Sequence, residues 1–137
     1  MNKLLPRLLA PGLLVIAALC GCTAQPQPEI TPKQQASLDA VLAGRTARPP
    51  VTCVSQHLLR GNRGFGEGVI LFEGSTGSTV YVNRPPGGCP ELNPFRALRI
   101  KTTTGQLCRG DIVSVFDATS GIEYGSCGLG DFVEYRK

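Results

Sequence analysis

Short runs of alternating or continuous apolar residues dominate the chain after residue 50. Val69–Phe72 is continuously apolar, as in a well-buried strand, while Thr79–Asn83 alternates apolar and polar positions. Similar patterns predict further strands at 98–104, 111–117, 122–127 and 132–135, separated by turn clusters rich in Gly, Pro and Ser. The pattern predicts an all-β fold, a small antiparallel barrel or sandwich of about six strands.

One helix is predicted, and it precedes the strands. Thr31 suits the N-cap, Pro32 the first turn, and Gln34 completes a capping box with Thr31, so the helix is expected at 32–43. It lies within residues 22–50, a proline-rich stretch without aromatic residues that is typical of a semi-rigid tether. Twelve residues are marginal as an isolated helix, so this one either docks on the domain or forms only transiently.

The first 21 residues have the pattern of an export signal, with a cationic start and an apolar stretch at Leu13–Cys20. This stretch is too short for a permanent membrane span. It ends in Leu19-Cys20-Gly21-Cys22, which resembles a bacterial lipobox. By that resemblance, Cys22 carries diacylglycerol through a thioether and becomes the first mature residue. The alternative is ordinary cleavage after Ala24, which would give a secreted soluble protein.

Composition separates the tether from residues 51–137, the predicted β domain. All eight aromatic residues lie in that domain, and its nine Lys and Arg nearly cancel its eight Asp and Glu. A balanced charge does not favour nucleic acid as a partner. The lipobox places the domain in the bacterial envelope, and Thr23 after Cys22, where Asp is absent, favours the outer membrane by analogy with enterobacterial sorting, with the domain facing the periplasm.

Four cysteines fall inside the predicted domain, at Cys53, Cys89, Cys108 and Cys127. Their gaps of 36, 19 and 19 residues contain no Cys-x-x-Cys pair, so two disulfides are favoured over a metal site or a redox motif, and no cofactor is expected. Sequence leaves three connectivities open. A hairpin turning at 118–121 favours Cys108–Cys127 with Cys53–Cys89.

Candidate functional side chains are few. The glycine-rich stretch 61–68 is expected to form a mobile turn, in which Arg63 and Phe65 are the candidates for partner contact. His57, the single histidine, would need a carboxylate supplied by the fold to act as a general base. Arg84, Arg96, Arg99 and Lys101 could form a basic face for an anionic glycan or a lipid head group.

A resemblance covers nearly all of residues 51–137. It rests on the four-cysteine spacing and on the segments Ile70–Phe72, Tyr81–Asn83, Cys89–Leu92, Gln106–Asp111 and Cys127–Gly130. These features resemble a family of small bacterial envelope proteins of unknown function. The resemblance implies the domain boundaries and the disulfides, and it carries no activity or catalytic residue.

The sequence therefore predicts a non-enzymatic lipoprotein that is anchored to a membrane through Cys22. It would bind an envelope protein or a glycan, or serve a structural role. An inhibitor of lysozyme or of a protease is an alternative within the same class. A periplasmic hydrolase that uses His57 is the alternative from another class.

Overall fold

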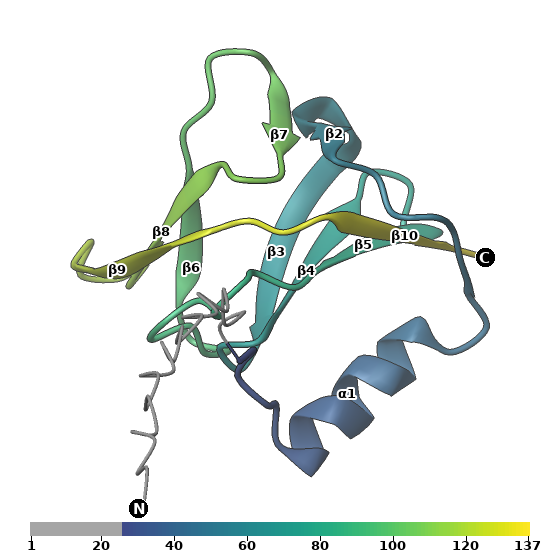
Figure 1. Ribbon diagram of the computed structural model, residues 1–137, viewed down its shortest axis with the longest axis horizontal. Helices are drawn as coiled ribbons and strands as arrows, with labels where there is room; N and C mark the ends of the chain where they lie inside the picture. Colours follow the sequence, from purple (N-terminus) through teal and green to yellow (C-terminus); the bar gives the residue numbers. More distant parts are fainter. Residues whose placement is uncertain (1–25) are drawn as a thin grey trace, which may run out of the picture.

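The computed structural model describes residues 26–137, so the predicted signal peptide and Cys22 lie outside the described residues. The described part holds one α-helix, one short 3-10 helix and ten strands (Figure 1). In chain order they are α1 (Pro32–Leu42), β1 (Thr46–Ala47), β2 (Cys53–Ser55), η1 (Gln56–Leu58), β3 (Leu59–Phe65), β4 (Val69–Gly74), β5 (Thr79–Asn83), β6 (Ala97–Ile100), β7 (Gln106–Cys108), β8 (Ile112–Phe116), β9 (Glu123–Gly128) and β10 (Phe132–Arg136).

The strands form three antiparallel sheets. The largest has the order β1-β10-β5-β4-β3, a second has the order β6-β8-β9, and β2 pairs with β7. Figure 1 shows β6, β8 and β9 grouped to one side of the five-stranded sheet. The all-β prediction is confirmed, and the arrangement is sandwich-like without a closed barrel. The six predicted strands are present, and β1, β2, β3 and β7 are additional.

The main core lies between the sheets. It combines apolar side chains from every sheet, with Phe72 of β4 and Phe132 of β10 in ring contact at a centroid distance of 5.6 Å. Asn83 is fully buried among them, and its side-chain amide both donates to and accepts from the backbone of Gly130, at 2.7 and 2.9 Å. Both polar atoms of the Asn83 side chain therefore have a partner, as buried polar groups require. The two hydrogen bonds connect β5 to Gly130, which precedes β10.

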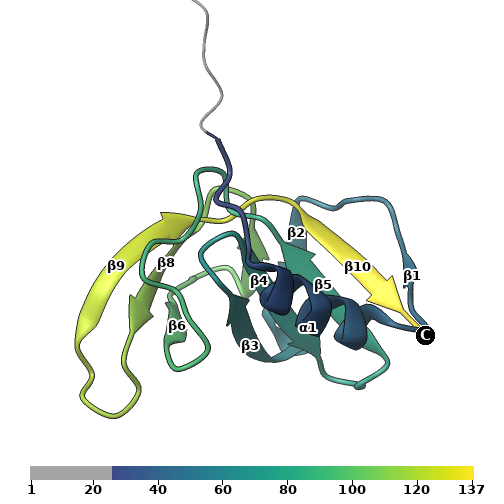
Figure 2. The ribbon, with the colours of Figure 1, turned by 90° about the horizontal axis from the view of Figure 1, so that it is seen from below.

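Helix α1 covers the other face of the large sheet, as Figure 2 shows. The predicted capping box is present: Thr31 Oγ1 accepts from Gln34 N, and the Gln34 side chain accepts from Thr31 N. Leu38 is fully buried on the sheet, in a second apolar cluster with Phe65, Val69, Leu71, Val80 and Val82. The sequence did not decide whether this helix docks on the domain or forms only transiently, and the structure shows that it docks.

The structure also differs from the expected tether on both sides of α1. Gln27 Nε2 donates to Gly68 O at 3.3 Å, and Arg48 N donates to Glu134 O at 2.8 Å. After the helix, β1 pairs with β10. The segment from Gln27 to Arg48 thus lies on the folded unit, because its apolar side chains cover a sheet face that would otherwise meet water.

The disulfides join Cys53 to Cys108 and Cys89 to Cys127. The pairing favoured from the sequence is therefore wrong. Cys108 lies in β7, which pairs with β2 instead of continuing the β8–β9 hairpin, and this register sets Cys53 opposite Cys108. The second bond ties β9 to the loop between β5 and β6.

We predict that removing the side chain of Leu38 destabilises the whole domain. Leu38→Ala should lower the free energy of unfolding by about 2–5 kcal/mol, because the helix loses its only fully buried side chain. Urea unfolding followed by circular dichroism measures this. Leu58→Ala, the same substitution at a half-exposed position, should cost less than about 0.5 kcal/mol. Equal small effects would mean that α1 does not hold to the sheet.

The disulfide pairing can be read directly from a tryptic digest without reductant, because each of the four cysteines falls in a different peptide. We predict links between peptides 46–60 and 102–109 and between peptides 64–96 and 110–136. A link between 46–60 and 64–96 would contradict the fold.

Replacing Cys89 and Cys127 together by Ala should cost about 4 kcal/mol of stability in the chain-entropy model.

Candidate functional site

The glycine-rich stretch is mostly a strand. Residues 61–65 belong to β3, and only residues 66–68 form the turn into β4, so the expectation of a turn over the whole of 61–68 is wrong for residues 61–65. Phe65 is 5% exposed and packs in the cluster beneath α1, so its ring is not available to a partner. Arg63 is half-exposed, pairs with Glu73 at 3.4 Å and lies 5.6 Å from the Phe65 ring.

Arg63 does line a surface groove, which we call the helix–loop groove. This groove has a volume of about 480 Å³ and lies between α1, β3 and the loop that joins β5 to β6. Lys33 and Gln34 contribute from α1, Arg63 and Phe65 from β3, and Pro94 and Phe95 from the loop. Its polar groups are cationic or neutral, while Phe95 and Pro94 supply an apolar wall.

Phe95 is the most exposed of the large apolar side chains in the described part of the chain, at 90%. Sequence reasoning missed it, although the Asn93-Pro94-Phe95 sequence offered a signal: an aromatic residue at a turn, outside any strand pattern. An aromatic ring left in water is more informative than an exposed small residue, since burying it would be favourable.

The loop that carries Phe95 is fixed at its base. Asn93 Oδ1 accepts from Phe95 N at 2.9 Å, and Arg96 bonds Glu91, with 2.5 Å between Arg96 Nη1 and Glu91 Oε2. The Arg96 guanidinium also lies over the Tyr124 ring, 3.6 Å from its centroid. These contacts, next to the Cys89–Cys127 disulfide, constrain the backbone at the base of the loop that presents the Phe95 ring.

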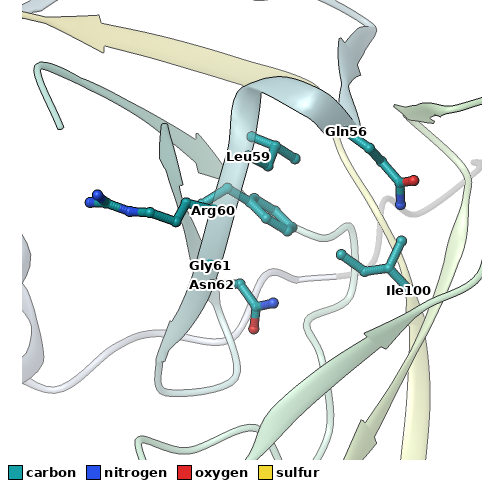
Figure 3. A pocket seen from close by; sticks show the side chains of 7 residues that line it. Gln56, Leu59, Arg60, Gly61, Asn62 and Ile100 are labelled. Atoms are coloured by element: carbon teal, nitrogen blue, oxygen red, sulfur yellow. The ribbon is translucent and has the colours of Figure 1, made fainter. Parts of the chain in front are cut away.

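A second hollow, of about 290 Å³, lies between β3 and β6 (Figure 3). The side chains of Gln56, Asn62 and Ile100 surround it, whereas Arg60 points away from it. Phe72, which belongs to the main core, also lines it. The hollow offers two neutral amides and apolar carbon, which suits weak polar contact and supplies no acid or base.

His57 lies in η1 and is exposed. Among the described residues the His57 side chain has no hydrogen bond or ion pair, and the hydrolase hypothesis stays a prediction. Nor do the described residues bring together three or more His, Cys, Asp or Glu that could hold a metal ion.

Two of the four cations in the basic face expected from the sequence are paired, whereas Arg84 and Lys101 are exposed and have no ion pair within the described residues. Arg96 pairs with Glu91, and Arg99 pairs with Glu123 while lying 4.6 Å from the Phe116 ring. Elsewhere, the Asp117 carboxylate accepts from the backbone N–H of Ser120 and Thr119, which lowers its pKa below the usual value. This carboxylate therefore closes the turn between β8 and β9.

Comparison with protein-family models, with curated proteins and with solved structures finds no match for this chain. In the described part, no helix has the length and apolar character needed to cross a membrane. The resemblance to four-cysteine envelope proteins therefore stays a prediction, and function has to be inferred from the residues themselves.

The two phenylalanines of the groove should behave oppositely when truncated. Phe65→Ala should lower the free energy of unfolding by about 3–5 kcal/mol, because it empties the cluster beneath α1. Phe95→Ala should change it by less than about 0.5 kcal/mol, because the ring already lies in water. Urea unfolding of both variants decides which ring is free to meet a partner. A large loss for Phe95→Ala would refute this assignment.

Proposed function

We propose that this chain is a lipid-anchored lipoprotein of the bacterial envelope with a non-enzymatic binding role. Its mature form would begin at Cys22, whose thiol carries diacylglycerol through a thioether. The protein would present the helix–loop groove and Phe95 to a partner at the membrane.

The observation that carries the proposal is the division of the cysteines. The four that follow residue 50 form two disulfides, which persist in oxidising compartments such as the bacterial periplasm. Such bonds support export of the chain. The other two, Cys20 and Cys22, stand in the segment that resembles a lipobox, where only Cys22 occupies the position of the modified residue.

The groove supports a binding role. Its apolar wall ends in an exposed ring held on a fixed loop, and its rim carries the charges of Lys33 and Arg63. Aromatic residues, phenylalanine among them, are enriched in protein interfaces relative to the rest of the surface. The lipid itself would hold the protein on the membrane. Each buried CH₂ group contributes about 0.8 kcal/mol, and two or more acyl chains on Cys22 suffice for stable anchoring.

The anchor is tested by changing each cysteine of the N-terminal motif separately. Cys22→Ala should abolish lipid attachment and release the protein from membranes, whereas Cys20→Ala, which keeps a small side chain, should leave both unchanged. Mass spectrometry of the mature N-terminal peptide and membrane fractionation measure these outcomes. A wild-type protein that begins at Gln25 without lipid would contradict the proposal and favour the secreted form.

A further inference from the structure

All five strands of the large sheet reach a common edge next to the end of α1. Thr46 of β1 lies opposite Arg136 of β10, and Arg136 lies opposite Thr79 of β5 (Figure 2). Strands β4 and β3 follow, with Gly74 opposite Leu59. With about 4.8 Å between neighbouring strands, this edge is about 19 Å wide. It is wide enough to contact several successive units of a linear ligand.

Cations line a small hollow between α1 and this edge. The hollow has a volume of about 140 Å³, and its charged lining residues are Arg45, Arg60, Arg63 and Glu73. Arg45 is fixed, because its guanidinium donates to backbone carbonyls in α1 and in the turn between β4 and β5. Glu73 is shared, since it lies 4.0 Å from Arg60 and 3.4 Å from Arg63. One carboxylate therefore faces three cations.

A second hollow, of about 350 Å³, opens between β1 and the end of β10. Its lining residues are Thr46, Arg48, Arg136 and Lys137. Arg136 pairs with Glu134 at 2.7 Å, whereas Arg48 and Lys137 have no ion pair within the described residues. Here too, one carboxylate accompanies three cations.

The two hollows together form the cationic edge, which we define by the side chains of Arg45, Arg48, Arg60, Arg63, Arg136 and Lys137. They adjoin, because Arg45 of the first directly precedes Thr46 of the second. In the described chain, only two carboxylates pair with these six cations. Residues 26–137 carry twelve Lys and Arg against ten Asp and Glu, so the remaining described residues hold six cations and eight carboxylates. Positive charge is therefore concentrated at this edge of a nearly balanced chain.

The cationic edge suits repeated negative charges better than a single one. The side chains of Arg60, Arg63 and Arg136 are 61, 47 and 51% exposed, so their guanidinium groups are accessible. A guanidinium presents several N–H donors in one plane, which matches the oxygens of carboxylate and phosphate groups. One such group would engage one or two cations. Six cations spread along about 19 Å match a chain that carries a charge on each repeat.

We propose that the cationic edge binds a linear polyanion, a polymer whose repeats carry carboxylate or phosphate groups. Arg48, Arg60 and Lys137 supply ionic contacts, and the Thr46 hydroxyl is a further donor. The site goes beyond the binding role proposed for the helix–loop groove, with which it shares only Arg63. It requires neither lipid on Cys22 nor the Phe95 ring.

Two labelled probes of similar length test the site and distinguish the two anionic groups. Oligogalacturonate carries a carboxylate on each sugar, and inorganic polyphosphate carries repeated phosphates. Fluorescence anisotropy measures their binding to the full-length protein in nonionic detergent at about 50 mM salt. Arg48→Gln with Arg60→Gln removes one exposed cation from each hollow. Arg84→Gln with Lys101→Gln is the matched control, because it removes two exposed cations outside the cationic edge.

We expect the Arg48→Gln, Arg60→Gln variant to bind the preferred probe about tenfold more weakly than the wild-type protein, because two exposed ionic contacts are lost. The control variant should lose less than about twofold. Raising the salt to about 500 mM should weaken the wild-type affinity at least about tenfold, since exposed charges are screened. Circular dichroism of both variants verifies that the fold is unchanged.

The outcomes separate the site from its ligand. Tighter binding of oligogalacturonate would identify a carboxylate polymer, and tighter binding of polyphosphate a phosphate polymer. Equal losses in the two double variants would overturn the site, because net charge alone would then explain the binding. Absence of binding by both probes at low salt would overturn the polyanion as the ligand. None of these results depends on the anchor or on the helix–loop groove.

Discussion

The packing of α1 on the large sheet is the contact on which the rest of the structure depends. Strand β4 is buried on both faces: Ile70 and Phe72 face the core between the sheets, while Val69 and Leu71 face the helix. A sheet with two apolar faces needs a cover on each, because exposed apolar surface destabilises the fold. The two smaller sheets, β6-β8-β9 and β2-β7, cover one face, and in the described chain α1 covers the other.

This cover determines where functional chemistry can lie. By docking, the segment from Gln27 onward brings the folded unit within a few residues of Cys22 and forms one wall of the helix–loop groove. It also removes Phe65 from the surface and leaves Phe95 as the exposed ring. A helix that looked like part of a spacer is therefore both a structural element and part of the candidate site.

Local signals in the sequence predicted much of the fold. The six strands with clear periodicity and the capping box at Thr31 are present, because each depends on neighbouring residues alone. Strand β3 was missed because its Gly and Arg residues lack strand periodicity, and it forms by pairing with β4. The disulfide pairing was missed for a related reason: it follows from the β2–β7 contact, which joins segments 55 residues apart. The candidate site depends on the pairing of β3 with β4 and on the docking of α1, because together they bury Phe65 and leave Phe95 exposed.

Native-state hydrogen exchange tests the central claim, that α1 is a stable part of the domain, most directly. The isolated helix would be marginal at its length, so protection of its amides has to come from docking. We predict that the amides of residues 38–42 exchange as slowly as those of β4 and β5 to within about tenfold. Exchange of these amides at the rate of an unstructured peptide, while β4 stays protected, would contradict the account.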